Sequence, residues 1–348
     1  MSAPIEMPRL SVIIPHYNGK EILLRCLQAL GDDAAFSVEV LVVDNASVDD
    51  SIEAAKSAFP AIRVVRSEKN LGYAGGCNLG MQAARADFFV LLNNDAMISV
   101  SELQKLWHVV QKQPEIAAVQ PKIRSITNTT CFDYAGAAGG FIDVMGFPFA
   151  RGRIFFTIEE DTGQYDQPGD IFWASGTCTL LRREAVEKTG LLDESFFAHM
   201  EEIDLNWRFH LLGYRVWYEP GAVVHHDAGT TLRPETPMKI YLNHRNSLLM
   251  LLKNYRWPTL CLLFPLRLIL EVIAVLFVLV QRDVPQAKAI VRGCLAVGLA
   301  LPQTLRARKI VQKKRILSDA QVFRRMFKNS IVVQYFLLKR KTFESLDI

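Results

Sequence analysis

The chain has 348 residues, of which half are apolar and 22% are charged, and its formal net charge is +4. This length suggests one large domain with an appendage, or two modest domains, and the ordinary glycine and proline content excludes a disordered or fibrous chain. The small net charge argues against wholesale binding to nucleic acid, while the mean hydropathy of +0.13 is high for a purely soluble enzyme.

The first third of the chain alternates short apolar runs with helical patterns. Strands are predicted over four apolar, mostly β-branched runs, Leu10–Ile14, Val38–Val43, Ile62–Val65 and Phe88–Leu92. Helices are predicted between them, where apolar residues recur every three or four positions, over Lys20–Leu30, Ile52–Phe59 and Asn78–Ala86. This alternation predicts a doubly wound α/β sheet with mostly parallel strands.

Sheets of this kind bind ligands beyond the carboxyl ends of their strands. All four segments at those positions are polar, namely Pro15–Asn18, Asp44–Asp49, Asn70–Asn78 and Asn93–Asp95. Their agreement predicts a ligand cleft at this edge of the sheet. From about residue 115 to 235 the pattern is less regular, and we expect an antiparallel or irregular half that completes the pocket.

The C-terminal region differs in character from the rest. Leu260–Val280 is apolar apart from Arg267 and Glu271, which lie four residues apart and are expected to pair on one helix face. Ala289–Leu301 is a shorter apolar stretch, and cations outnumber acids from Arg306 to Lys341. Because a spanning helix needs about 20 apolar residues, we expect an amphipathic tail on an anionic cytoplasmic leaflet. A helical subdomain or a dimer interface is the alternative.

The six cysteines form no C-x-x-C pair, and the N-terminus has no basic or apolar signal region. We therefore expect reduced thiols in a cytoplasmic protein, with neither a zinc module nor secretion. There is no G-x-x-x-x-G-K-[ST] segment, and no G-x-G-x-x-G follows the first strand, so the common phosphate-binding loops are excluded.

The polar segments carry chemistry of several kinds. Asp44 suits a nucleobase or a ribose hydroxyl, although a turn or helix cap is an equally ordinary role for it alone. Asp95 offers a carboxylate for Mg²⁺ or Mn²⁺. Glu201, Glu202 and Asp204 crowd the start of a helix, where the helix dipole accounts for part of the acidity. A Glu-Glu pair beside aromatic residues also suits a general base.

Five segments occur in the order and spacing of family 2 glycosyltransferases, namely Pro15–Asn18, Val43–Ser47, Asn70–Gly75, Leu92–Asp95 and Glu201–Leu205. Over about residues 10–232 the chain resembles this family, and within it the rhamnosyltransferase-like bacterial branch. The resemblance implies a GT-A fold over residues 1–240, with a nucleotide-sugar half up to about 115 and an acceptor half from 116. Residues 241–348 resemble the helical, basic, membrane-associated tail of bacterial members.

The resemblance also implies roles for single residues. The nucleotide-sugar would be contacted by Pro15, Tyr17, Asn18, Asp44, Asn45, Ser47, Asn70, Gly72, Tyr73, Ala74, Asn78, Asn93, Asn94 and Arg245. Asn93 and Asp95 occupy the two ends of the family's Asp-x-Asp motif, which leaves Asp95 as the metal carboxylate. His226 would complete the metal or diphosphate site, and Arg245 would neutralise the departing diphosphate.

On the acceptor side, Glu202 falls on the position of the catalytic base, where the family usually has Asp. Glu201 is expected to bind the acceptor, together with Trp173, Ser175 and Gly176. Trp173 would stack on a sugar, although a large indole is as often part of a core.

The expected function is an inverting, metal-dependent transfer of a sugar, with rhamnose as one candidate, from a nucleotide-diphosphate sugar to a cell-surface glycan or lipid-linked acceptor. The expected place is the cytoplasmic face of the plasma membrane. A processive polysaccharide synthase, a nucleotidyltransferase and an inactive glycan- or membrane-binding scaffold are the alternatives. Lys253 stands where the synthase motif Gln-x-x-Arg-Trp needs Gln. The sequence does not indicate an oligomeric state.

Overall fold

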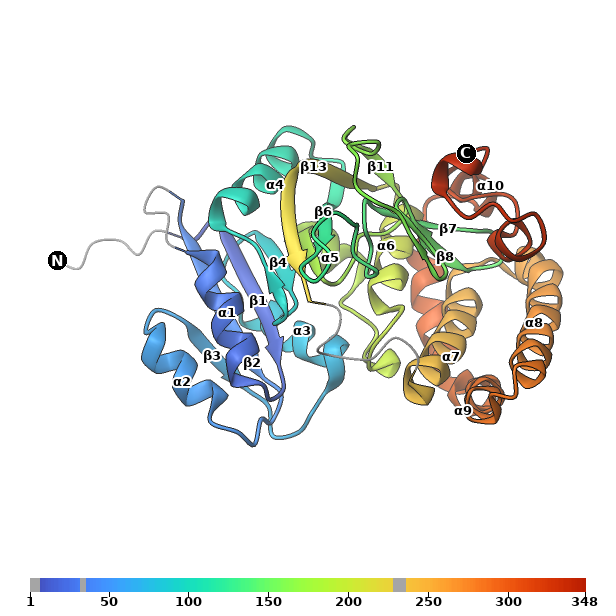
Figure 1. Ribbon diagram of the computed structural model, residues 1–348, viewed down its shortest axis with the longest axis horizontal. Helices are drawn as coiled ribbons and strands as arrows, with labels where there is room; N and C mark the ends of the chain where they lie inside the picture. The colour runs from blue at the N-terminus through green and yellow to red at the C-terminus, as the bar shows by residue number, and fades with distance from the viewer. Residues whose placement is uncertain (1–6, 32–35, 228–235) are drawn as a thin grey trace.

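The computed structural model describes residues 7–31, 36–227 and 236–348. Its centre is a nine-stranded sheet in the order β11–β13–β6–β12–β4–β1–β2–β3, with β5 paired to β13 (Figure 1). The strands are β1 Leu10–His16, β2 Val38–Asp44, β3 Arg63–Arg66, β4 Phe88–Leu92, β5 Ala96–Met97, β6 Ile116–Ser125, β11 Gly169–Ile171, β12 Cys178–Arg182 and β13 Arg215–His226. The predicted α/β class is confirmed.

The N-terminal half of the sheet is parallel, since β1 pairs in parallel with β2 and β4, and β2 with β3. The polar segments after these strands therefore lie at one edge. Helices α1 Lys20–Leu30, α2 Ser51–Ala58 and α4 Val100–Lys112 share an apolar core with one face of the sheet. Helices α3 Gly72–Ala83, α5 Arg183–Thr189 and α6 Glu201–Leu211 share the core of the other face.

Helix α3 begins six residues before its predicted start at Asn78, because its glycines allow it to pack closely on the sheet. A Cβ atom at Gly80 would lie 2.2 Å from Ile13 Cγ2, and one at Gly76 would lie 2.7 Å from Asn45 Nδ2. The small residues that resemble a loop in the sequence are therefore the contact surface of a helix.

The second half is more regular than expected. Strands β6 and β13 are parallel to each other, while β12 is antiparallel to β4 and β6. Antiparallel pairing, as expected for this half, also forms a separate four-stranded sheet of β7 Gly140–Ile142, β8 Pro148–Ala150, β9 Arg153–Ile154 and β10 Thr157–Ile158.

The C-terminal region consists mainly of α7 Pro237–Asn254, α8 Trp257–Val280, α9 Val284–Lys314 and the short α10 Asp319–Val322. The expected domain limit at residue 240 falls inside α7. This helix shares a core with α6, in which the rings of Trp207 and Tyr255 meet edge to face at 4.8 Å. The region is therefore packed against the sheet domain (Figure 1).

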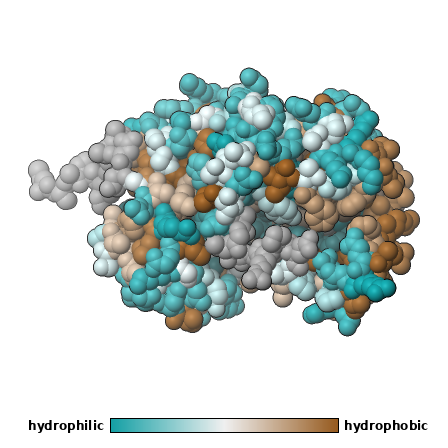
Figure 2. Space-filling view, in the orientation of Figure 1, coloured by the Kyte–Doolittle hydropathy of each residue, from teal (hydrophilic) through white to brown (hydrophobic). Residues whose placement is uncertain are grey.

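Helices α8 and α9 are long and apolar enough to cross a membrane, by length and composition alone. The predicted pair within α8 forms, with Arg267 Nη2 2.6 Å from Glu271 Oε1. Both side chains are buried, and Arg267 also donates to Met145 O and Ser247 Oγ. The charges thus face the protein, while hydrophobic residues gather on the outer flank over α8 (Figure 2). These two apolar helices weakly suggest membrane association.

Candidate active site

The end of β2 forms the first wall of the candidate site. Asp44 is buried and accepts a hydrogen bond from Ser47 N at 2.8 Å, and its second oxygen lies 3.6 Å from Arg66 Nε. Ser47 Oγ accepts from Asn18 N. Asn18, with φ 56°, returns a bond by accepting from Val48 N. The turns after β1 and β2 therefore hold each other in place.

The residues around these turns differ in exposure. Pro15 is buried on β1, whereas the ring of Tyr17 is 49% exposed and free to meet a ligand. Asn94 Nδ2 lies 2.9 Å from Nδ1 of His16, which links the end of β4 to the end of β1. Asn93 is held by its backbone, which donates to Thr177 O at 2.9 Å.

The start of α3 lies against the same edge. Asn45 donates from Nδ2 to Gly72 O at 3.1 Å, and its Oδ1 has no partner among the described residues. Asn70 Oδ1 accepts from Gly72 N. The backbone of Gly72, with φ 70°, comes so close to Phe197 that a Cβ would lie 2.4 Å from Phe197 O. Ala74 N donates to that same carbonyl.

A histidine between two carboxylates lies past the end of β4. His226 Nε2 is 3.1 Å from Asp95 Oδ1, and its Nδ1 is 2.8 Å from Asp133 Oδ1. Burial lowers the pKa of His226, but the hydrogen bonds to Asp133 and then Asp95 outweigh it and raise the pKa to about 10. All three side chains are buried.

This arrangement suits a metal held jointly with a substrate. Among the described residues, no three His, Cys, Asp or Glu side chains form a cluster that alone would hold an ion. Asp95 offers a carboxylate, the ligand that Mg²⁺ takes from a protein when phosphates supply the rest, and His226 Nε2 would add a second ligand once a metal displaced the proton that the raised pKa favours. Asp133 would then fix the other ring nitrogen, as carboxylates do behind metal-bound histidines.

The loop before α6 is held in an uncommon backbone conformation. Phe197, His199 and Met200 have φ values of 63°, 67° and 72°, which non-glycine residues rarely adopt. The side-chain amide of Asn246 on α7 donates to the carbonyls of Phe196, Ala198 and His199 at 2.8–3.0 Å. The C-terminal region therefore shapes the loop that leads into Glu201 and Glu202.

Arg245 and Asn78 support the same region. Arg245 Nη1 donates to Ser195 O at 2.9 Å, and its predicted contact with diphosphate stays a prediction. Asn78 is buried, donates to Leu192 O and accepts from Leu192 N. Its amide thus ties α3 to the segment before the loop, and its contact with the nucleotide also stays a prediction.

The two glutamates at the start of α6 have unusual protonation. Each has one carboxyl oxygen, Oε2, that is inaccessible and without a partner among the described residues. Burial raises the pKa of Glu202 to about 7. Burial, and then the neighbouring Glu202, raises the pKa of Glu201 well above its usual range. The pair therefore holds a proton more tightly than ordinary glutamates do, and Glu202, with a pKa of about 7, is placed to exchange a proton near neutral pH.

Tyr73 connects the α3 wall to these carboxylates. Its hydroxyl donates to Gly176 O at 2.6 Å. Burial raises the pKa of Tyr73 well above its usual value, and the nearby Cys77, Glu201 and Glu202 add to this effect. The start of α3, the segment around Gly176 and the start of α6 therefore meet around one phenol ring.

The predicted acceptor residues before β12 are well packed. Trp173 is only 4% exposed and donates from its indole to Phe141 O, so its geometry is that of a core residue and sugar stacking stays a prediction. Ser175 N donates to Gln120 Oε1, and Ser175 Oγ donates to Ala135 O. Gly176 has no room for a Cβ, which would lie 2.8 Å from the Tyr73 hydroxyl.

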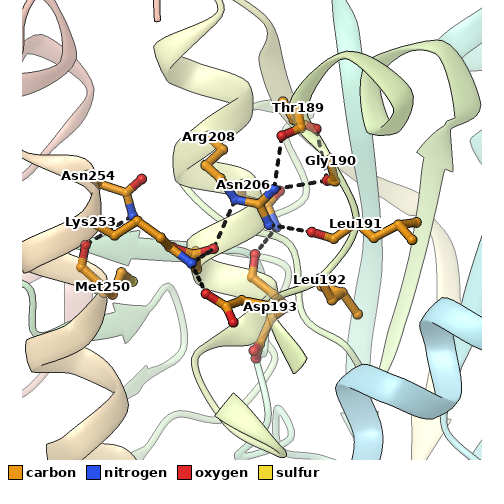
Figure 3. A network of polar contacts seen from close by, with 12 residues as sticks. Thr189, Gly190, Leu191, Leu192, Asp193, Asn206, Arg208, Met250, Lys253 and Asn254 are labelled. Atoms are coloured by element: carbon orange, nitrogen blue, oxygen red, sulfur yellow. Dashed lines mark hydrogen bonds and ion pairs between the residues drawn. The ribbon is translucent and has the colours of Figure 1, made fainter. Parts of the chain in front are cut away.

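A buried ionic network behind α6 fixes its orientation (Figure 3). Arg208 Nε donates at 2.9 Å to Asp204, which lies four residues earlier on the helix, and the Arg208 Nη atoms donate to Gly190 O and Leu191 O. Lys253 on α7 pairs with both Asp193 and Asp204. The helix that carries Glu202 is thus fastened on both sides.

Sequence reasoning missed Asp133, Arg66 and the role of Asn246. Asp133 lies in an irregular segment and has no motif of its own. Arg66 ends β3 and reaches Asp44 only because β3 pairs with β2. The order of the sheet could have suggested Arg66, whereas nothing in the sequence pointed to Asp133.

Comparison with known proteins fits this geometry. The family model described as glycosyl transferase family 2 matches residues 11–190. Over 243 residues the chain is 30% identical to an N-acetylglucosaminyl-diphospho-decaprenol L-rhamnosyltransferase of Mycobacterium tuberculosis, covering 64% of this chain and 78% of that enzyme. It is 23% identical over 248 residues to the low-salt glycan biosynthesis hexosyltransferase Agl10 of Haloferax volcanii, and this match covers 69% of this chain and 74% of that protein.

The fold is similar to that in a crystal structure of GalNAc-T7 with UDP, GalNAc and Mn²⁺, with a TM-score of 0.56 and 17% identity. That likeness covers 71% of this chain and 48% of the other, so the chain spans about half the length of that structure. The shared architecture is the GT-A fold. From the family match over more than half of its length, the chain belongs to glycosyltransferase family 2.

Proposed function

We propose that this transferase moves a sugar, with L-rhamnose as the favoured candidate, from a nucleotide-diphosphate sugar to a lipid-linked glycan at the cytoplasmic face of the plasma membrane. The sugar and the acceptor are suggested by the 30% identical relative from Mycobacterium tuberculosis, an N-acetylglucosaminyl-diphospho-decaprenol L-rhamnosyltransferase. The exposed apolar flank of α8 supports the membrane location.

The observation that carries the proposal is the position of Glu202. Its carboxyl is near Tyr73 on α3, the helix that begins at Gly72, whose carbonyl accepts from Asn45. Its pKa of about 7 suits a group that takes up a proton at physiological pH. In this proposal Glu202 removes the proton from the acceptor hydroxyl as that oxygen attacks the anomeric carbon.

The donor side supports departure of the diphosphate. Asp95 and His226 would hold Mg²⁺ or Mn²⁺, which when bound offsets the negative charge that builds on the leaving phosphate. Asp133 keeps the His226 ring oriented. Attack from the side opposite the leaving group in one displacement inverts the anomeric carbon, and Glu202 acts as base and not as nucleophile.

The test is a transfer assay with the purified full-length protein in detergent. The donors are dTDP-rhamnose, UDP-GlcNAc and GDP-mannose, and the acceptor is a short polyprenyl diphosphate carrying N-acetylglucosamine. We expect metal-dependent addition of one rhamnose with inverted anomeric configuration, read by mass spectrometry and NMR. Transfer of a different sugar would contradict the choice of donor, and retained configuration would contradict the single displacement.

A further inference from the structure

A cavity of about 490 Å³ lies where α8 begins and α9 ends, and it shares no lining residue with the transferase site. Its wall includes Arg256, Trp257 and Pro258 from the start of α8, and Leu305 and Lys309 from α9. Cations and an aromatic ring thus surround a space large enough for a small polar group.

Two further lining residues have a structural task. Arg308 donates to Leu252 O and Tyr255 O, and Gln312 donates to Lys253 O and Asn254 O. These carbonyls end α7, where the helix dipole favours donors and positive charge. The Arg308 guanidinium also lies 4.2 Å from the centre of the Trp257 ring, and so holds this ring in place.

Arg256 and Lys309, in contrast to Arg308 and Gln312, donate to none of the carbonyls at the end of α7 in the described structure. Both are exposed, and their side chains make no hydrogen bond or ion pair with any described residue that would neutralise them. Asp319, which accepts from the backbone N–H of Arg256, is paired with Arg315. The start of the 24-residue helix α8 adds further positive potential. The cavity is therefore complementary to an anion.

An apolar stripe leads away from this cavity along α8. Leu262, Leu266, Ile269, Ile273 and Leu276 follow Pro258 at intervals of three or four residues, which places them on one side of the helix. Each is between 48% and 68% exposed. Hydrophobic residues accordingly cover the outer flank of the molecule over α8 (Figure 2). The cationic cavity is complementary to the anionic headgroup of a lipid, and the apolar stripe is complementary to the acyl chains of that lipid.

We propose that this cavity binds the phosphate headgroup of an anionic membrane phospholipid, while its acyl chains lie along the apolar stripe of α8. Arg256 and Lys309 contact the phosphate, and Trp257 lies at the boundary between headgroup and hydrocarbon, a position that Trp favours. The proposal rests on the membrane association proposed above and adds a defined lipid site to it.

The experiment compares vesicle binding by the full-length protein after detergent removal. The vesicles contain phosphatidylcholine alone or phosphatidylcholine with about 30 mol% of the anionic lipid phosphatidylglycerol. The test variant is Arg256→Gln/Lys309→Gln. The control is Arg282→Gln/Lys288→Gln, which removes two equally exposed cations near the other end of α8. Unfolding curves of both variants establish that they are folded.

We expect the test variant to bind phosphatidylglycerol vesicles about 30-fold more weakly than the unaltered protein, and to bind neutral vesicles equally well. The control should lose much less. Brominated phosphatidylglycerol should quench Trp257 fluorescence in the unaltered protein, and Trp257→Phe should remove that signal.

Equal losses in both variants would overturn the proposal, because the attraction would then be general. The proposal would also be overturned if millimolar inorganic phosphate alone quenched Trp257 fluorescence or protected the protein against unfolding. It would likewise be overturned if the protein bound neutral vesicles tightly only after a polyprenyl diphosphate was added. If no vesicle binds the unaltered protein, the membrane association itself fails. If binding is strong but insensitive to Arg256 and Lys309, only the lipid site fails.

Discussion

Replacing Glu202 by Gln removes the proposed base and also removes a charge that the folded protein tolerates poorly. The amide has nearly the same shape as the carboxylic acid but cannot take up a proton. We expect the rate of sugar transfer to fall by about 10²–10⁴-fold, the usual contribution of a positioned base. Nucleotide binding should be almost unchanged, since the donor contacts come from other elements.

The effect on stability follows from the pKa. Burial raises the pKa of Glu202 from 4.5 to about 7, and each pKa unit corresponds to about 1.4 kcal/mol. Ionisation in the folded state therefore costs up to about 3 kcal/mol relative to the unfolded chain. The stability associated with the neutral carboxyl is fully present below about pH 4.5 and is lost as the pH rises to about 7. The Gln variant keeps this stability at high pH, because its amide does not ionise.

Urea unfolding at pH 5 and pH 8 measures this difference, and calorimetry with the nucleotide measures donor binding. The variant should gain stability over the unaltered protein at pH 8 and very little at pH 5. Glu201→Gln is the matched control, because burial and the neighbouring Glu202 raise the pKa of Glu201 well above its usual range, so its replacement should leave the pH dependence of stability in place. Full turnover by Glu202→Gln, or a stability difference independent of pH, would refute the assignment.

Three other replacements test the supports of the site and the tail. Asp133→Asn should weaken Mn²⁺-dependent nucleotide binding by about 10–100-fold in calorimetry, because it releases the ring of His226. Asn246→Ala, which deletes the bonds to the strained loop before α6, should lower kcat while the KM for the donor changes little. Arg267→Met removes the arginine partner of buried Glu271 and leaves its contact with His244, so it should lower the free energy of unfolding by up to about 3 kcal/mol in denaturant titrations.

Each of these has an outcome that counts against it. Unaltered metal dependence in Asp133→Asn would mean that His226 needs no orienting carboxylate. A parallel rise in donor KM in Asn246→Ala would indicate a general loss of structure. The double replacement Arg267→Met/Glu271→Leu should regain most of the lost stability, and equal instability of single and double variants would show that the ion pair is not the cause.

Much of the sheet domain was predictable because local patterns and tertiary packing agree there. The runs at Leu10–Ile14 and Phe88–Leu92 are apolar because these strands are covered on both faces, and both lie inside the observed strands. The start of α3 was mispredicted because its glycines serve the packing against Ile13 and Asn45. A single sequence does not distinguish such glycines from those of a loop.

The candidate site likewise contains residues that were predictable from the sequence and residues that were not. The placement of Asp44 and Asp95, which lie at or just after the ends of the two parallel strands on either side of β1, was predictable from topology. Asp133 and Asn246 were not, because they reach the site across more than 90 and about 50 residues of chain, through the contacts to His226 and to the 196–199 loop. Such contacts depend on how separate elements pack, which no local pattern records.

The proposed reaction requires a single cleft in which Asp95 and His226 lie on the donor side and Glu202 lies on the acceptor side. Anomalous diffraction from crystals containing Mn²⁺ and a nucleoside diphosphate tests this arrangement directly. We predict one manganese peak about 2.0–2.3 Å from an Asp95 oxygen and from His226 Nε2, with the diphosphate between it and Glu202. A peak bound elsewhere, or a nucleotide on a surface that Glu202 does not face, would contradict the account.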